Sequence, residues 1–182
     1  ECPQEKIPET GYSLRSPQTM STAEQSGSFI FTGNSLQIPA IGLGMETPIP
    51  IVHVGYVGDT YESGWNLKMV GGYIGELEGG AYLPFAGNSV LTGHYYSQGV
   101  FVNLTGLHLE DEVIVYGNDG MKYIYKVTNS YYTKPTDVLQ LFQPNGERSL
   151  TLVTCDDYNF ITDDYNKRFI VQATLELSEP YQ

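Results

Sequence analysis

Cysteine, histidine and basic residues are all scarce in this chain. Its 182 residues include two cysteines, Cys2 and Cys155, three histidines, and 9 lysines and arginines against 21 aspartates and glutamates. So few scattered cysteines and histidines do not readily build a closed four-ligand zinc site, and two cysteines do not make a disulfide scaffold. A net charge of −12 argues against nucleic acids and anionic membrane surfaces as partners, because both require a basic surface. The composition indicates an acidic domain with at most one cysteine of chemical interest.

Long apolar runs are also missing, and none approaches the roughly 20 residues of a transmembrane helix. The chain begins at Glu1 rather than at methionine, so we expect a processed or truncated product whose membrane anchor preceded this segment. Residues 1–27 are rich in Ser, Thr and Gln and have no apolar periodicity, which predicts a flexible linker. Residues 28–182 are predicted to form the folded domain.

The chain does contain a series of short segments rich in β-branched and aromatic residues, broken by glycine and proline. These predicted strands lie within residues 29–34, 35–43, 47–58, 88–96, 112–133, 149–155 and 168–177. Within residues 112–133, Asn118, Asp119 and Gly120 predict the turn of a hairpin. Residues 101–107 predict a short helix, glycine-rich residues 61–88 predict loops with at most a helical turn, and residues 156–167 predict a polar loop. Many short strands with one short helix favour a closed or nearly closed β-barrel.

Cys155 ends the predicted strand 149–155, and a residue there lies on the rim of a barrel, where a substrate can approach. A buried core cysteine is nevertheless the more common situation, and the strand alone favours it. An unperturbed thiol is only about 3% ionised at pH 7, so a nucleophilic role requires a nearby histidine or arginine. That role also requires an unpaired sulfur.

Three histidines and one arginine are candidates for this help. His53 lies in an apolar strand and His108 follows the predicted helix, so structural roles are favoured for both. His94 follows a glycine at the end of a strand, and a catalytic role is as well supported there as a structural one. Arg168 opens the last predicted strand. If that strand neighbours the strand of Cys155, the guanidinium reaches the same rim and can stabilise an oxyanion.

Taken together, these residues resemble the motifs of the sortases, cysteine transpeptidases of bacterial cell surfaces. Residues 151–155 (TLVTC) resemble the TLxTC signature of the family, and residues 92–94 (TGH) resemble the motif that carries its histidine. Arg168 matches the arginine of the last strand, and the order histidine, cysteine, arginine is the order in the family. The resemblance covers roughly residues 35–177, and residues 134–138 (KPTDV) and 154–159 (TCDDYN) are most similar to class A sortases.

The resemblance implies an all-β fold, namely a closed eight-stranded β-barrel with one or two short helices. It also implies that a sorting signal of the Leu-Pro-X-Thr-Gly type is cleaved between Thr and Gly and that the protein is transferred to an amine nucleophile on the cell wall. Cys155 would form the thioester, His94 would act as general acid and then general base, and Arg168 would hold the carbonyl oxygen. The implied partners are surface proteins that carry the signal, and the implied location is the extracellular face of the bacterial cell membrane.

The candidate substrate-binding residues come from the loop after KPTDV and from positions flanking the catalytic residues. Core packing is a nearly equal alternative for those in the loop. The candidates are Thr92, Val138, Leu139, Leu141, Thr151 and Val153.

No metal or other cofactor is predicted. Some class A sortases bind calcium through acidic residues, but residues 79–88 contain none here and residues 141–149 contain only Glu147. The acidic stretch of residues 156–167 is better interpreted as a solvated loop than as a calcium site. Its acidic residues are Asp156, Asp157, Asp163 and Asp164.

Two alternatives remain open. One is a sortase of another class, D- or E-like or pilin-type, with a different signal, and the other is a catalytically silent β-barrel that binds peptides. The L,D-transpeptidases are less compatible because their compact histidine–glycine–cysteine motif is absent, and papain-like and NlpC-type enzymes place cysteine before histidine. The role of Cys2 is not predicted.

Overall fold

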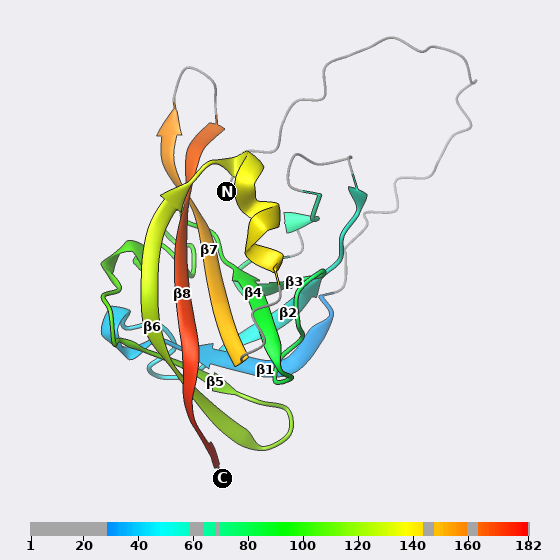
Figure 1. Cartoon of the computed structure of the whole chain (residues 1–182), viewed down its shortest axis with the longest axis vertical. Helices are drawn as coiled ribbons and strands as arrows, with labels where there is room; N and C mark the ends of the chain where they lie inside the picture. The colour runs from blue at the N-terminus through cyan, green and yellow to red at the C-terminus, as the bar shows by residue number, and fades with distance from the viewer. Residues whose placement is uncertain (1–28, 59–63, 68–69, 144–147, 160–163, 182) are drawn as a thin grey trace, which may run out of the picture.

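Eight strands close into one barrel in the computed structural model, in the order β1-β2-β3-β4-β7-β8-β6-β5 (Figure 1). The structure describes residues 29–58, 64–67, 70–143, 148–159 and 164–181, so the predicted linker 1–27 lies outside the described residues. The all-β prediction and the closed eight-stranded barrel are confirmed. The strands are β1 (Phe31–Gln37), β2 (Ile49–Val54), β3 (Ile74–Leu77), β4 (Gly87–Thr92), β5 (Glu112–Tyr116), β6 (Met121–Thr133), β7 (Arg148–Asn159) and β8 (Asp164–Pro180).

The predicted hairpin is the antiparallel pair β5–β6, with Tyr116 opposite Lys122. Gly120 lies in its turn with φ +79°, a left-handed conformation that costs glycine little. The carboxylate of Asp119 accepts hydrogen bonds from the Met121 backbone N–H at 3.1 Å and from the Tyr123 hydroxyl at 2.5 Å. These contacts are local in sequence, which is why turn chemistry and alternation predicted the hairpin correctly.

The last two strands are longer than their apolar patterns predicted. β7 continues to Asn159, which pairs with Asp164 at the start of β8. The predicted polar loop 156–167 is therefore wrong for most of its length, because a polar sequence can continue an antiparallel ladder whose backbone hydrogen bonds need no apolar side chain. Cys155 lies within β7 and Arg168 within β8, not at strand ends as predicted.

The glycine-rich residues 61–88, predicted as loops, contain strand β3. All four residues of β3 are buried, so the strand lacks the alternation of a half-exposed strand. Gly75 is required there, because a Cβ at this position would lie 2.8 Å from Val54 and Val70 side-chain atoms. The glycine that argued against a strand thus permits close packing around it.

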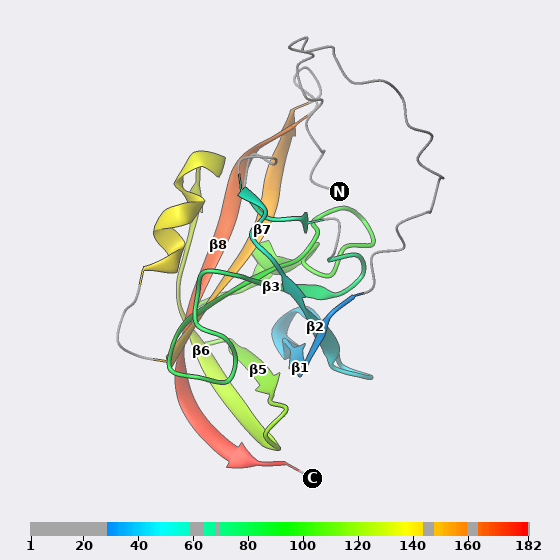
Figure 2. The same cartoon turned by 90° about the vertical axis from the view of Figure 1, so that its right-hand side faces the viewer.

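Three short 3₁₀ helices are described: η1 (Pro39–Ile41), η4 (Leu104–Gly106) and η5 (Pro135–Phe142). The helix predicted over residues 101–107 is only the single turn η4. Figure 2 shows η5, the yellow coil, beside β8 on the outside of the barrel. No helix in the described part of the chain has the length and hydropathy needed to cross a bilayer.

Two apolar clusters form on opposite sides of the sheet. The larger fills the barrel and includes fully buried Leu91, Leu150 and Leu152. The smaller lies outside the barrel, where Val90 and Val153 pack beneath side chains from η5 and from the segment between β2 and β3. Alternate residues of β7 therefore enter different clusters, as the two-residue period of a strand requires.

Glu76 is a buried carboxyl group on β3, only 2% exposed. Its Oε1 accepts a hydrogen bond from the Leu83 backbone N–H at 2.7 Å, which ties the loop between β3 and β4 to the barrel. Desolvation by burial outweighs this hydrogen bond and raises the pKa of Glu76 to about 7. The folded state therefore favours the protonated form, and its stability falls as the pH rises from the unfolded-state pKa of about 4.5 to about 7.

Replacing Glu76 by glutamine is expected to make stability less dependent on pH. Glutamine keeps the oxygen that accepts from Leu83 but cannot ionise. The stability change caused by Glu76→Gln should be more favourable at about pH 8 than at about pH 4 by about 3 kcal/mol. Urea unfolding at both pH values measures it, and taking the difference cancels any fixed cost of the amide. Glu46→Gln at an exposed site controls for the lost charge, and an equal stability change at both pH values would contradict the prediction.

Candidate active site

Cys155 and Arg168 lie directly opposite each other on the antiparallel strands β7 and β8. Residues directly opposite each other in such a pair project from the same face of the sheet, with Cβ atoms about 5 Å apart. Cys155 is 5% exposed, and Arg168 is half-buried. The guanidinium Nη1 donates to the Lys167 carbonyl oxygen at 3.2 Å, so its position is partly set by the backbone. The predicted proximity of these two residues is confirmed.

His94 follows β4, which runs parallel to β7 with Thr92 paired to Val153. Contacts continue one residue further, since Gly93 N–H donates to Val153 O at 3.4 Å and Thr154 Oγ1 donates to Gly93 O at 2.8 Å. These contacts hold Gly93 against β7 just before Cys155, and His94 is the next residue of that segment. The histidine is 8% exposed, and its ring centroid lies 5.3 Å from that of Tyr96.

Gly93 is needed for this arrangement. A Cβ there would lie 2.6 Å from Val100 and 2.8 Å from Phe101, so any side chain would push away the segment that follows. Phe101 N–H donates to the His94 carbonyl oxygen at 3.0 Å and closes the loop back onto the histidine. In the sequence Thr-Gly-His, the glycine therefore allows Val100 and Phe101 to pack closely against the backbone, and the imidazole of His94 comes directly after it.

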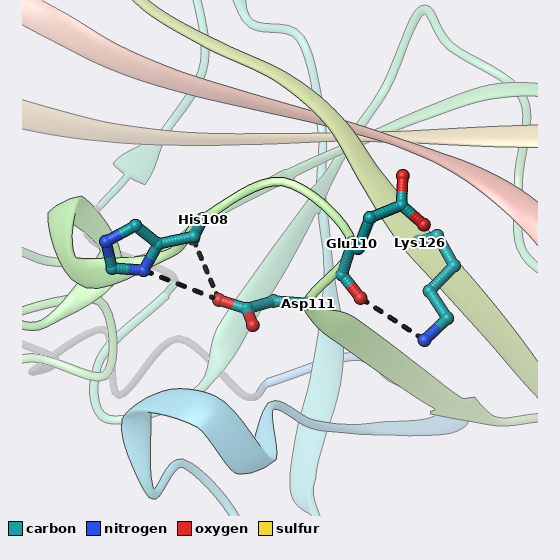
Figure 3. A network of polar contacts seen from close by, with 4 residues as sticks. All are labelled: His108, Glu110, Asp111 and Lys126. Atoms are coloured by element: carbon teal, nitrogen blue, oxygen red, sulfur yellow. Dashed lines mark hydrogen bonds and ion pairs between the residues drawn. The ribbon is translucent and has the colours of Figure 1, made fainter.

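The other two histidines have local structural contacts. Figure 3 shows His108 in a turn, where its backbone N–H donates to the Asp111 carboxylate at 2.8 Å and its Nδ1 lies 3.9 Å from the same oxygen. Lys126 donates to the Glu110 carbonyl oxygen beside it at 3.2 Å. His53 lies on β2, with its ring centroid 5.8 Å from that of Tyr82. Both positions match the structural roles favoured for these residues.

An apolar groove of about 250 Å³ opens over Cys155 and Arg168. Three of the predicted substrate-binding residues, Thr92, Val138 and Val153, line it. The predicted substrate-binding residues include none from the segment between β2 and β3 or from β3, because neither carries a motif. The remaining lining residues are Trp65, Leu67, Leu77, Pro135, Thr136 and Thr154.

One wall of the groove is η5, which is held to the barrel by a buried asparagine. Asn88 on β4 donates through Nδ2 to the Leu141 carbonyl oxygen at 2.5 Å. Its Oδ1 accepts from Ser149 Oγ at 3.2 Å and from Thr151 Oγ1 at 2.9 Å. This network fixes η5 against β4 and β7, and with it the position of Val138.

The other predicted substrate-binding residues lie outside this groove. Leu139 is 61% exposed on η5, whereas Leu141 packs in the outer apolar cluster. Thr151 is buried and bonded to Asn88. Leu141 and Thr151 line a separate polar cavity of about 420 Å³ beside η5.

The sulfur of Cys155 is disulfide-bonded in this structure, contrary to the expectation of an unpaired thiol. The one other cysteine of the sequence, Cys2, lies outside the described residues. A disulfide sulfur is not a nucleophile, so Cys155 must be reduced before it can attack a carbonyl.

Among the residues that the structure describes, no group of three or more histidine, cysteine or acidic side chains could hold a metal ion. The side chains of the acidic stretch that was considered for calcium are not described, so that interpretation stays a prediction.

Comparison with known proteins agrees with this geometry. The Sortase domain model matches residues 36–176, which include His94, Cys155 and Arg168. The chain belongs to the sortase family. Sortase A of Staphylococcus aureus is 48% identical to this sortase over 59 residues, which are 32% of this chain and 28% of the relative. The match thus spans less than a third of the curated relative's length.

Solved sortase structures share the fold. Sortase C-1 from Actinomyces oris aligns with a TM-score of 0.61 at 26% identity, covering 79% of this chain and 73% of that one. A sortase D5 transpeptidase from Clostridium perfringens aligns with a TM-score of 0.60 at 25% identity, covering 79% and 78%. Sortase E from Streptomyces avermitilis aligns with a TM-score of 0.64 at 23% identity, covering 84% and 93%. Similar scores for three different classes mean that the fold does not assign the class.

Proposed function

We propose that this sortase is a cysteine transpeptidase that cleaves a Leu-Pro-X-Thr-Gly-type sorting signal between Thr and Gly. The acyl group is held as a thioester on Cys155 and is then transferred to an amine nucleophile of the cell wall. One observation carries the proposal: Arg168 lies directly opposite Cys155, and His94 follows Gly93, which is hydrogen-bonded to β7 at Val153 and Thr154. This brings together a nucleophile, a proton donor and acceptor, and a permanent cation at one end of an apolar groove.

In the first half-reaction the reduced Cys155 thiolate attacks the Thr carbonyl carbon. A C–S bond forms and the carbonyl electron pair moves to oxygen, where the charge of Arg168 stabilises the oxyanion. The oxyanion then collapses, the C–N bond to Gly breaks, and His94 protonates the departing amine. The product is a thioester and a free Gly amine.

In the second half-reaction the acceptor amine attacks the thioester carbonyl and gives a proton to His94. The C–S bond breaks, and the thiolate of Cys155 is regenerated with a new amide bond on the product. His94 therefore returns to its protonated form, and no proton is gained or lost over the cycle. No metal is needed to activate the nucleophile or the carbonyl in this scheme.

The groove supports a signal that begins with apolar residues. Its walls carry Leu77, Val138 and Pro135, which suit a leucine and a proline better than charged side chains.

The partners and the location follow from the same proposal. We infer that the substrates are surface proteins bearing the signal, and that the enzyme acts on the extracellular face of the bacterial membrane, anchored by a segment outside this sequence. The similarity of residues 134–138 and 154–159 to class A sortases favours that class. A D- or E-like or pilin-type sortase with a different signal is the alternative.

The proposal is tested with fully reduced protein and a panel of signal peptides mixed with amine acceptors. Mass spectrometry should find cleavage between Thr and Gly, a protein adduct equal to the acyl fragment, and an amide product with the acceptor. The competing hypothesis, a silent peptide-binding barrel, predicts peptide binding with no adduct. It also predicts no labelling of reduced Cys155 by a Leu-Pro-X-Thr peptide that carries an electrophile.

A further inference from the structure

Trp65 is the only tryptophan in the sequence, and it lies in the wall of the catalytic groove. It belongs to the segment between β2 and β3, for which no motif predicts a function. The side chain is only 3% exposed, yet it borders the space that Leu77 and Val138 also line. A large flat side chain at this place limits what the groove can accept.

Three contacts hold the indole in one orientation. Its ring stacks on Phe142 of η5 at a centroid distance of 4.9 Å and an interplanar angle of 9°. Tyr56 meets it edge-on at 5.3 Å and 74°. Its Nε1 donates to the Glu78 carbonyl oxygen at 2.8 Å. The indole therefore joins the two walls of the groove and has little freedom to swing aside.

Strand register places this stack far from the nucleophile. The β3–β4 pairing runs from Gly75–Thr92 to Glu76–Leu91, so its next step is Leu77 beside Val90. Val90 pairs with Thr151, four residues before Cys155 on β7. Since a strand rises about 3.3 Å per residue and neighbouring strands lie about 4.8 Å apart, Leu77 lies about 13 Å along β7 and two strands across from Cys155, or about 16 Å in all.

Phe142 reaches the same end. A Cβ built on Gly79, two residues beyond Leu77, would lie 3.4 Å from the Phe142 ring. The Trp65–Phe142 stack thus closes the groove at the end remote from Cys155. With its scissile carbonyl at Cys155, an extended peptide that lies along the groove presents to the stack a side chain several residues before the acylated residue.

We propose that the Trp65–Phe142 stack determines substrate specificity by limiting the size of this upstream side chain. A branched aliphatic side chain fits against the fixed indole, and an aromatic side chain is excluded because the indole cannot move. This inference rests on the proposed function, in which the position is the leucine that starts the signal.

The first test compares kcat/KM for two reduced-enzyme substrates that differ only in leucine or phenylalanine at that position. We expect the wild type to prefer leucine by at least about tenfold, which corresponds to about 1.4 kcal/mol. Trp65→Ala should shift the ratio toward phenylalanine by about tenfold or more, whereas Trp65→Phe should shift it less because an aromatic wall remains. Trp65→Leu is a second truncation in case Trp65→Ala fails to fold.

The matched control is Phe85→Ala, which removes another aromatic ring, 70% exposed in the loop between β3 and β4. It should leave the leucine-to-phenylalanine ratio unchanged. A ratio that stays within about twofold of wild type in folded Trp65→Ala or Trp65→Leu would overturn the proposal.

The second test does not depend on turnover. In Cys155→Ala protein, emission reports on Trp65 alone, because the chain has no other tryptophan. Saturating leucine peptide should change the emission, and a peptide with alanine at that position should change it much less. Calorimetry measures binding of the same peptides independently.

The two tests separate this inference from the proposed function. If no peptide is cleaved and none binds by calorimetry, the proposed function fails. If peptides are cleaved or bound while Trp65 emission and the specificity ratio do not change, the function stands and the role of Trp65 is wrong.

Discussion

Replacing Cys155 by alanine is expected to abolish both signal cleavage and transfer, with kcat/KM falling by at least about four orders of magnitude. The thioester requires a sulfur nucleophile, and a methyl group in its place cannot form any acyl-enzyme. The remaining groups would still bind the peptide, so calorimetric affinity for the uncleaved signal should persist. The measurement is product formation by mass spectrometry with enzyme that has been fully reduced.

The fold should tolerate this change. Cys155 is 5% exposed, and its replacement by alanine removes one atom from the floor of the groove. Circular dichroism and thermal unfolding of the variant, compared with reduced wild type, control for structural damage. Retention of more than about 1% of wild-type transpeptidation by folded Cys155→Ala would contradict the assignment of the nucleophile.

Replacing Arg168 by alanine is expected to lower kcat by about 10²- to 10³-fold, or about 3–4 kcal/mol of transition-state stabilisation. The guanidinium lies across from Cys155 in the register, and in the proposed mechanism it stabilises the carbonyl oxygen at which negative charge develops. Because this charge is absent from the free peptide, the effect should fall mainly on kcat rather than on KM. Steady-state kinetics on the preferred signal peptide measure both constants.

Arg168→Lys is the conservative control. It keeps the positive charge but loses the planar, forked geometry of the guanidinium, so it should recover only part of the lost rate. If Arg168→Ala raises KM and leaves kcat within about threefold of wild type, Arg168 binds the ground state and does not stabilise the oxyanion.

Local sequence patterns predicted some elements of this molecule well. The β5–β6 hairpin was recognised because its alternation and the Asn-Asp-Gly turn act over neighbouring residues. The extension of β7 and β8 to Asn159 and Asp164 was missed, because only backbone pairing between the two strands stabilises that polar stretch. Strand β3 was missed because all its residues are buried and its glycine resembles a loop signal.

The residues of the site likewise divide into those that local patterns predicted and those that they missed. Motif spacing predicted His94, Cys155 and Arg168 as catalytic residues, whereas Trp65 had no signal beyond being the only tryptophan. Leu139 and Val138 are adjacent and equally apolar, yet only Val138 faces the groove. Which of them turns inward depends on how η5 is anchored by Asn88, and that contact joins residues 53 positions apart in the chain.

By itself, the sequence predicted the fold class and, through its resemblance to the sortases, the chemistry. That resemblance implies Cys155 as the nucleophile, His94 as the proton carrier and Arg168 as the cation. Repeated short β-branched segments specify a barrel, because local propensity and alternation decide which residues extend and which face they bury.

Only the tertiary structure decided which residues face each other. The parallel β4–β7 register places Thr92 beside Val153, the antiparallel β7–β8 register places Cys155 opposite Arg168, and Trp65 stacks on Phe142. Those contacts join residues distant in the chain, so their pairing is set by the packing of the whole barrel and not by any local pattern.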